Sequence, residues 1–497
     1  MTARPPLTIK NPITGDAIGS APNSTPDDVQ AAVTRARAAQ PDWDARGAQS
    51  RARLLRLWGD ALWQHRAEVI ETIRRETGKN ETGAFLEMIV LDNVIEYYAK
   101  HTPRLLRPQR RRTLFPVVQY ARVYYRPHGV TGFITPWNYP YLNALMDAVP
   151  ALAAGNTAVI KPSEITPFTA QHAVSLAYRA GLPRDVLHVV TGDGATGAAL
   201  VDEVDYISLT GSTATGRTVA ARAAERLIPY SLELGGKDPL IVLDDVDLDL
   251  AATMTLQGAL ENAGQVCMST ERVYVLDAIY DRFIDRLIHY ARQLIVGPQA
   301  GYDVHVGSMT NEREVQRCET QIADAVGKGA RVVFGGQRHP DLGPLFFEPT
   351  ILVDVDHSMD VMRDETFGPL IPVMRVRSAE EAIRLANDSQ YGLSSAVFSR
   401  DLKRGEAVAC RIQAGDTSVN RTQFVIGTPS LPSGGQKESG IGRRGGPEGL
   451  MRFVTPKAVL VDRMWISRPT LTLLDPLLYR LLIIQRALRR WLPFITP

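Results

Sequence analysis

Residues 130–160, VTGFITPWNYPYLNALMDAVPALAAGNTAVI, begin and end with a short apolar run typical of a buried strand. Further runs of this kind follow at residues 186–190 and 206–209. Helical stretches separate the runs, as at residues 168–180. This alternation of strands and helices predicts a parallel sheet with helices packed on it.

The same pattern resumes after Gly235, with strands expected at residues 240–243, 272–276 and 330–334. Before it, residues 25–100 have helical periodicity. A chain of 497 residues is too long for one hydrophobic core. We therefore expect two α/β domains in tandem.

Composition excludes several functional classes. The net charge of +2 gives no reason to invoke nucleic acid. The cysteines are far apart, so no metal site or disulfide framework is predicted, and their small number suits a reducing, cytoplasmic setting; they are Cys267, Cys318 and Cys410. The first residues lack the apolar core of a signal peptide, and no uncharged apolar run reaches the roughly 18 residues of a membrane span.

The C-terminal segment 476–492 predicts a basic amphipathic helix, about 26 Å long at 1.5 Å per residue. Its arginines lie to one side of an apolar stripe formed by Leu477, Leu481, Ile484, Leu488 and Trp491. Such a helix packs on the protein's own surface or on a partner subunit, contacts a membrane peripherally, or covers a substrate channel as a lid. The sequence leaves these alternatives open.

Cys267, in the run ENAGQVCMS at residues 261–269, is a candidate nucleophile. Taken alone, a cysteine among apolar residues is more often an inert core residue. Gly264 permits close backbone approach beside it, and two other motifs offer the groups that a thiol nucleophile requires.

The first of these motifs is ELGGKDP at residues 233–239, where Glu233 is followed by paired glycines. A carboxylate beside open space suits a general base acting through water, although a solvated loop glutamate is the alternative. The second is TPWNYP at residues 135–140, whose prolines stiffen the loop around Asn138. Its amide could donate to an oxyanion, or Asn138 is an ordinary turn residue.

Taken together, seven motifs resemble the aldehyde dehydrogenase superfamily across about residues 8–462. They are PWNYP (136–140), KPSE (161–164), LTGST (209–213), ELGGK (233–237), GQVC (264–267), ETFGP (365–369) and GGQKESG (434–440). The run RRGGPEGL at 443–450 and the apolar tail are most similar to bacterial succinate-semialdehyde dehydrogenase-like members.

The resemblance implies a role for each candidate. Cys267 attacks the aldehyde carbon, and Asn138 with the backbone N–H of Cys267 holds the oxyanion. A hydride then passes to the nicotinamide, and Glu233 activates water to hydrolyse the thioester. Members that transfer the acyl group to coenzyme A usually lack this glutamate, so Glu233 favours release of the free acid.

For the cofactor, the run GDGATG at residues 192–197 fits the G-x-G-x-x-G pattern, but a single match is weak. The resemblance instead implies that the pyrophosphate lies at residues 211–216, where Ser212 precedes a helix. It also implies that Lys161 and Glu164 face the adenine ribose, so that Glu164 favours NAD over NADP. NADP is the alternative, if Glu164 swings away and Lys161 holds the 2′-phosphate. The remaining implied contacts are Thr135, Pro136, Trp137, Ser163, Gly211, Glu365 at the nicotinamide ribose, and Phe367.

For the substrate, family members specific for succinate semialdehyde carry arginines at positions that correspond here to Met146 and Glu261. With Tyr141, Leu142 and Leu145 on the same helix, this lining predicts an apolar or aromatic aldehyde. The alternatives are that these side chains lie in the core, or that the substrate is succinate semialdehyde. Asp147 is a further departure, since many relatives carry lysine there.

The resemblance implies a Rossmann-type NAD-binding domain, a catalytic α/β domain and a small β oligomerisation arm. We expect the first at residues 1–111 and 130–234, the second at 235–424, the arm at 112–129 and 425–465, and the tail at 466–497. Such arms add strands to a neighbour's sheet, which predicts a homodimer or a homotetramer. Functions outside this class are a cysteine esterase and a catalytically silent binding protein.

Overall fold

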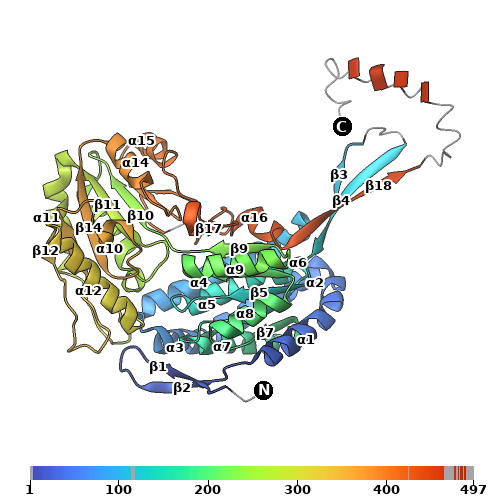
Figure 1. Cartoon of the computed structure of the whole chain (residues 1–497), viewed down its shortest axis with the longest axis horizontal. Coiled ribbons are helices and arrows are strands. Elements are labelled where there is room, and N and C mark those ends of the chain that lie inside the picture. The colour runs from blue at the N-terminus through green and yellow to red at the C-terminus, as the bar shows by residue number, and fades with distance from the viewer. Residues whose placement is uncertain are drawn as a thin grey trace.

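The computed structural model describes residues 4–113, 118–423 and 425–463, and residues 475–476, 479–480, 482–484 and 486–487 of the tail. Two α/β bodies lie side by side, and a strand-rich extension projects from one of them (Figure 1). Each body is built around its own mostly parallel sheet. The predicted α/β fold class is confirmed.

The first sheet has six strands in the order β17-β9-β8-β5-β6-β7. Five strands run parallel, and only β17 pairs antiparallel, with β9. The bounds are β5 Val130–Ile134, β6 Thr157–Lys161, β7 Leu187–Val189, β8 Tyr206–Thr210, β9 Tyr230–Glu233 and β17 Gly440–Ile441. The strand expected at 186–190 is shorter because residues Arg184–Val186 form a 3-10 turn.

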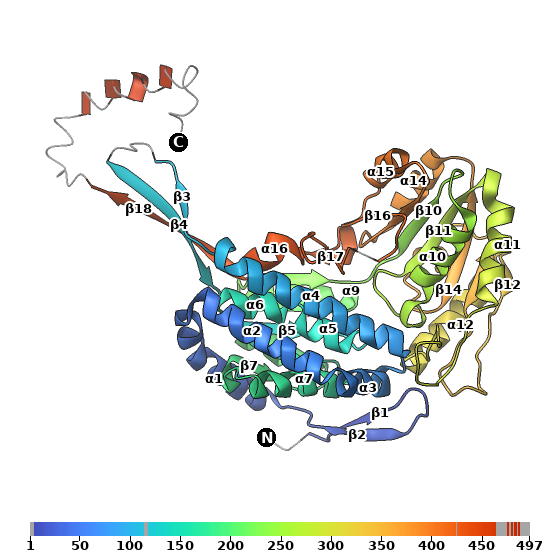
Figure 2. The same ribbon diagram turned by 180° about the vertical axis from the view of Figure 1, so that it is seen from behind.

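Helices cover both faces of this sheet (Figure 2). Val159 of β6 packs into one hydrophobic cluster with α1, α8 and α9, whereas Ala158 and Ile160 pack into the other with α2 to α7. Because both faces are covered, residues on both sides of strands such as β6 and β8 are buried rather than alternately buried and exposed. The helices are α1 Pro26–Ala45, α2 Gly47–Gln64, α3 Arg66–Thr77, α4 Glu81–Leu105, α5 Pro140–Leu145, α6 Ala148–Ala154, α7 Pro167–Arg179, α8 Gly194–Glu203 and α9 Thr213–Glu225.

The second sheet has seven strands in the order β12-β13-β14-β11-β10-β15-β16, parallel except for the β12–β13 pair. They are β10 Asp238–Val242, β11 Thr270–Leu276, β12 Arg331–Phe334, β13 Thr350–Val353, β14 Leu370–Val376, β15 Ala396–Phe398 and β16 Ser418–Val419. Its helices are α10 Leu248–Leu260, α11 Tyr280–Ala291, α12 Glu312–Gly327, α13 Asp360–Arg363, α14 Ala379–Asn387 and α15 Leu402–Ala409. The short helix α16, Gly446–Met451, precedes the extension.

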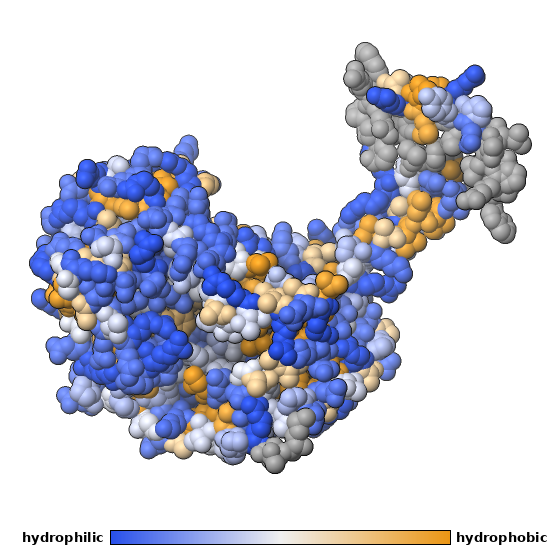
Figure 3. Space-filling view, in the orientation of Figure 1, coloured by the Kyte–Doolittle hydropathy of each residue, from blue (hydrophilic) through white to orange (hydrophobic). Residues whose placement is uncertain are grey.

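The extension is a three-stranded antiparallel sheet of β3 Gln109–Arg111, β4 Gln119–Pro127 and β18 Val454–Asp462. Strand β3 begins before residue 112, where the arm was expected to start, and β17 belongs to the six-stranded sheet. Apolar side chains are visible along the extension (Figure 3), and Tyr120 and Leu460 are 40% and 60% exposed. A hairpin of β1 Leu7–Lys10 and β2 Ala17–Ala21 near the N-terminus was not anticipated.

The described tail residues are helical, and most are exposed. Of the predicted apolar stripe only Ile484 is described, at 52% exposure, and the other four stripe residues lie outside the described residues. Within the part of the chain that the structure describes, no helix is long and apolar enough to cross a membrane.

The packing of α2 against α7 predicts a large difference between two tryptophans of α2. Trp58 is fully buried, and its indole N–H donates to the Ala173 carbonyl at 3.0 Å, whereas Trp63 is 38% exposed. Trp58→Ala should lower the free energy of unfolding by about 3–5 kcal/mol, because it leaves a cavity and an unpaired carbonyl. Urea denaturation measures this, with Trp63→Ala as the matched control. Equal losses in both variants would contradict the packing.

Candidate active site

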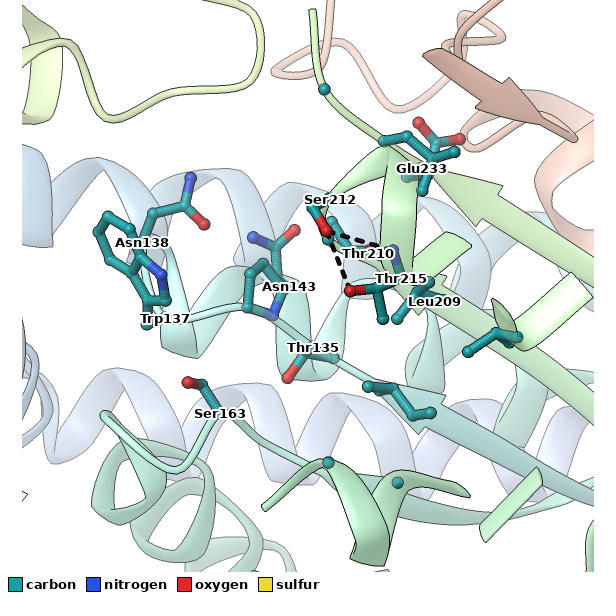
Figure 4. Close-up of a pocket in the computed structure, with 18 of the residues that line it drawn as sticks. Thr135, Trp137, Asn138, Asn143, Ser163, Leu209, Thr210, Ser212, Thr215 and Glu233 are labelled. Carbon is teal, nitrogen blue, oxygen red and sulfur yellow. Dashed lines mark hydrogen bonds between the residues drawn. The ribbon is translucent and has the colours of Figure 1, made fainter. Parts of the chain in front are cut away.

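One cavity of about 460 Å³ lies at the carboxyl ends of the parallel strands of the first sheet. Figure 4 shows Trp137 and Asn138, from the loop after β5, facing Ser212 and Glu233 across it. The cavity is lined by all three predicted catalytic residues and all ten predicted cofactor residues: Asn138, Glu233, Cys267, Thr135, Pro136, Trp137, Lys161, Ser163, Glu164, Gly211, Ser212, Glu365 and Phe367. Residues from distant parts of the sequence therefore meet in one site.

Cys267 follows a tight 3-10 turn, Glu261–Gly264, at the end of α10. Asn262, Ala263 and Gly264 all have positive φ, at 51°, 54° and 74°. A Cβ atom at Gly264 would lie 2.1 Å from the Gly368 carbonyl oxygen, so the position requires glycine for space as well as for backbone conformation. The turn directs the chain from α10 into the cavity, where Cys267 is half-buried.

The paired glycines after Glu233 are required by close contacts on both sides. A Cβ at Gly235 would lie 2.6 Å from a Glu365 carboxylate oxygen, and one at Gly236 would lie 2.4 Å from the Cys267 carbonyl oxygen. The Gly236 N–H also donates to Glu365 at 3.1 Å. These glycines therefore allow the segments that carry Glu233, Cys267 and Glu365 to lie against one another. This role adds to the open space beside Glu233 that the sequence suggested.

Asn138 is held firmly by its surroundings. Its side-chain Nδ2 donates to the Gln265 carbonyl at 2.9 Å, and its own carbonyl accepts from Lys79 at 2.8 Å and from Asn262 at 3.0 Å. An amide NH₂ carries two hydrogens, so one remains for a ligand. The buried Lys79 is in turn paired with the buried Glu87 at 2.5 Å, which fixes the loop against α4.

Burial dominates the ionisation of the site. It raises the pKa of the Glu233 carboxyl to about 7, while Arg444 and Arg452 act in the opposite direction. Burial also raises the pKa of Glu365 to about 8 and that of Cys267 to about 12. Glu233 is therefore able to exchange a proton near neutral pH. Its Oε1 is buried and has no hydrogen-bond partner among the described residues.

Two helix N-termini border the other end of the cavity. Ser212 caps α9, and its hydroxyl accepts from the Thr215 N–H at 3.3 Å (Figure 4). Gly194 and Gly197 of the run GDGATG lie at the start of α8, which also lines the cavity. The first N–H groups of α8 are already occupied, because the Asp193 carboxylate accepts from Ala195 and Thr196. Both G-rich segments line the same cavity, and only the start of α9 lacks a carboxylate cap.

The predicted ribose contacts all line the cavity. Lys161 Nζ is 3.4 Å from Glu164 Oε2, and the side chain of Glu164 is 48% exposed. The Phe367 ring meets that of Trp137 edge-on, with ring centroids 5.4 Å apart. Lys237 and Glu271 form a buried ion pair at 2.8 Å, and Glu271 accepts from the Phe367 N–H, which fixes this loop.

Three arginines that no sequence motif indicated also line the cavity: Arg222 of α9 and Arg313 and Arg317 of α12. Arg317 pairs with Glu314 at 2.6 Å. The sequence gives no signal for the three arginines, because arginines are common on helix surfaces. No fixed spacing in the sequence links α12 to the glycine-rich segments either. Only the fold brings these side chains to the cavity.

The five residues predicted to line the substrate pocket have different surroundings. Tyr141, Leu142, Leu145 and Met146 belong to the buried hydrophobic cluster against which Cys267 packs. Tyr141 and Leu145 are 1% and 0% exposed and lie within the core, as the alternative interpretation expected. Glu261 accepts a hydrogen bond from the Tyr139 hydroxyl at 2.8 Å. None of the five lines the cavity that holds Glu233 and Glu365.

The chain matches the aldehyde dehydrogenase family over residues 2–459 and belongs to it. It is an NAD(P)-dependent aldehyde dehydrogenase. It is 40% identical to a putative succinate-semialdehyde dehydrogenase [NADP(+)] 2 of Mycobacterium ulcerans, over 94% of this chain and 90% of that protein. It is 38% identical to the succinate-semialdehyde dehydrogenase [NADP(+)] of Escherichia coli K12, over 92% of this chain and 94% of that protein.

Solved structures agree with this assignment. An E. coli NADP-dependent enzyme superposes with a TM-score of 0.89 at 38% identity, over 92% of this chain and 95% of that one. The lactaldehyde dehydrogenase of E. coli superposes with a TM-score of 0.88 at 34% identity, over 93% of this chain and 97% of that one. The family resemblance drawn from the seven motifs is confirmed.

The raised pKa of Cys267 predicts how the free enzyme reacts with iodoacetamide. Only the thiolate is alkylated, and below a pKa of about 12 its fraction grows tenfold per pH unit. Labelling of Cys267, followed by peptide mass spectrometry, should therefore keep rising through pH 10. Labelling of the exposed Cys410 in the same sample is the internal control for the activity of iodoacetamide at each pH. A plateau for Cys267 below pH 9 would contradict the environment described.

Proposed function

We propose that this enzyme oxidises an aldehyde to the free carboxylic acid through a thioester on Cys267. The observation that carries the proposal is the cavity in which the Cys267 thiol, the Asn138 amide and the Glu233 carboxylate meet the helix N-termini. Each chemical requirement of a thioester mechanism is met by a separate group there.

In this mechanism Cys267 Sγ, as the thiolate, bonds to the aldehyde carbon while the carbonyl π bond breaks, and the free Nδ2 hydrogen of Asn138 supports the oxygen that becomes negative. NAD(P), when bound, supplies the hydride acceptor. Glu233 then takes a proton from water, which adds to the thioester carbon as the C–S bond breaks. A carboxyl whose pKa is about 7 is well matched to this exchange.

The cavity fits a dinucleotide. The start of α9 suits its pyrophosphate, with Ser212 beside it, and Arg222, Arg313 and Arg317 add positive charge to the cavity lining. We propose that Lys161 and Glu164 hold the adenine ribose, and that Glu365 and Phe367 hold the nicotinamide end. A carboxylate at Glu164 repels a 2′-phosphate, which favours NAD, although the two relatives named above carry NADP in their names.

For the substrate, we propose an apolar or aromatic aldehyde. Cys267 packs against a hydrophobic cluster that contains Leu142 and Met146, and Glu261 brings a carboxyl rather than a cation to the turn before Cys267. Succinate semialdehyde is the second candidate, because relatives at 38–40% identity bear that name. A cation elsewhere in the site would then have to hold its carboxylate.

We further propose that the chain assembles as a homodimer or homotetramer through the extension, which exposes apolar side chains on β4 and β18. The proposed domain limits are residues 1–111 with 130–234, 235–424, and 112–129 with 425–465, except that β3 adds Gln109–Arg111 to the extension and β17 adds Gly440–Ile441 to the first sheet. For the tail, we retain peripheral membrane contact, a lid and packing on a subunit as alternatives. Truncation after Arg463 followed by vesicle binding and chain-length preference separates them.

A panel of aldehydes tests the proposed function. NADH formation should follow aldehyde consumption one to one, with higher kcat/KM for long alkanals and benzaldehyde than for succinate semialdehyde. Cys267→Ala should abolish the reaction while leaving cofactor binding intact. Ester hydrolysis without cofactor reduction would instead identify an esterase, and no turnover a silent binding protein. Preference for succinate semialdehyde would overturn the substrate proposal but not the reaction.

The position of Glu164 predicts cofactor preference. The wild-type enzyme should have the higher kcat/KM with NAD, and Glu164→Gln should improve kcat/KM for NADP about tenfold by removing repulsion worth about 1.4 kcal/mol. Glu380→Gln, which removes an exposed carboxylate paired with Arg411, is the control for net charge. A wild-type preference for NADP would show that Glu164 does not set the selectivity.

A further inference from the structure

A buried ion cluster joins the α5–α6 corner to the segment around α16. Asp147 accepts from Arg444 through Nε at 3.0 Å and Nη2 at 2.8 Å, and it also accepts from Arg452. The three side chains are 3%, 8% and 10% exposed. Burying charges without water is costly, so a cluster of one anion and two cations calls for a further partner.

The cluster lies on the sheet face that carries Glu233. Side chains two apart on a strand share a face, which places Ser208 with Thr210 on β8 and Ser231 with Glu233 on β9. In the register of these strands, Thr210 lies opposite Glu233. Asp147 accepts from the Ser208 hydroxyl at 3.0 Å, and Arg444 donates to the Thr210 hydroxyl.

Arg452 completes the arrangement by donating to the Ser231 hydroxyl at 3.0 Å. A small cavity beside Arg444 is lined by Met146 and Ile426, which pack in or against the same hydrophobic cluster as Cys267. The guanidinium of Arg444 is thus held at Thr210, the register partner of Glu233. It interacts electrostatically with both Glu233 and Cys267 and does not line the cofactor cavity.

The groups that face Glu233 are Arg444, Arg452, Asp147 and Arg443, with Cys267 and Tyr206 also close enough to interact. Burial raises the pKa of Glu233, Asp147 adds to that effect, and the arginines oppose it. Because three arginines and only one aspartate surround Glu233, the electrostatic potential at its carboxylate is positive. Without that potential, burial alone would keep Glu233 protonated to higher pH.

We propose that Arg444, clamped by Asp147, is the positioning residue that keeps Glu233 ionised for thioester hydrolysis. The inference rests on the proposed role of Glu233. In that step a proton moves from water to Glu233, the water oxygen bonds to the acyl carbon, and the C–S bond breaks to release the Cys267 thiolate. Arg444 touches none of these atoms and acts through the charge of the carboxylate.

Decay of the acyl-enzyme tests this role directly. The full-length enzyme is acylated with 4-nitrophenyl acetate, quenched in acid at intervals, and its intact mass shows the fraction still acylated. The decay rate of the wild type should rise with pH through one midpoint. Arg444→Gln should move that midpoint up by about one pH unit or more, and Arg444→Lys, which keeps the charge, should largely restore it.

Asp147→Asn provides a test of opposite sign. It removes the anion that raises the pKa of Glu233, so the midpoint should move down. A merely structural role would slow both variants without shifting their midpoints in opposite directions. Arg375→Gln, which removes one charge from an exposed ion pair on the second sheet, is the control and should leave the midpoint in place. If Arg444→Gln does not fold, Arg444→Lys carries the test: it keeps the positive charge, so a midpoint far from that of the wild type would overturn the role of Arg444.

Glu233→Gln distinguishes the role of Arg444 from the role of Glu233 in thioester hydrolysis, on which it rests. If its acyl-enzyme decays as fast as that of the wild type, Glu233 is not the base and the proposed function is wrong in that step. If Glu233→Gln blocks decay but the Arg444 and Asp147 variants keep the wild-type midpoint, the proposed function stands and the role of Arg444 is overturned.

Discussion

The site depends on the short connection between the two sheets. Strand β9 ends at Glu233 and β10 begins at Asp238, so the chain crosses from one body to the other beside the cavity. Gly236 passes the Cys267 carbonyl, and Gly235 the Glu365 carboxylate, so closely that a side chain at either position would displace its neighbour. This crossing places a carboxylate of the first sheet and a thiol of the second within one cavity, and larger residues there would separate them.

Buried ion pairs fix the loops around that crossing. Lys79 with Glu87 holds the Asn138 loop from the helical side, and Lys237 with Glu271 holds the loop that carries Glu365. A buried pair gains little stability over an apolar contact, but removing one partner leaves an uncompensated charge. The pairs therefore fix the positions of the loops more than they add to the free energy of unfolding. This suits a site whose reacting groups must keep fixed distances from one another.

The same burial sets the chemistry of the site. Desolvation raises the pKa values of Cys267, Glu233 and Glu365 together, which disfavours three negative charges in one cavity. Compensating positive charge comes from Arg444 and Arg452, whose segments belong to the last part of the described chain. The C-terminal segment between the second sheet and the extension thus contributes to the electrostatics of a site built mainly by earlier residues.

The sequence by itself determined the α/β class, four strands of the first sheet, three of the second and the motifs that meet in the cavity, because periodicity and glycine requirements are local properties. It could not decide which helix starts share one site, so the runs at residues 192–197 and 211–216 appeared as rivals. It also suggested a substrate lining that includes Tyr141 and Leu145, which the fold packs into the core. Asp147 and Arg444 lie 297 residues apart, and only tertiary structure pairs them, because a buried charge takes its partner from whatever segment the fold brings beside it.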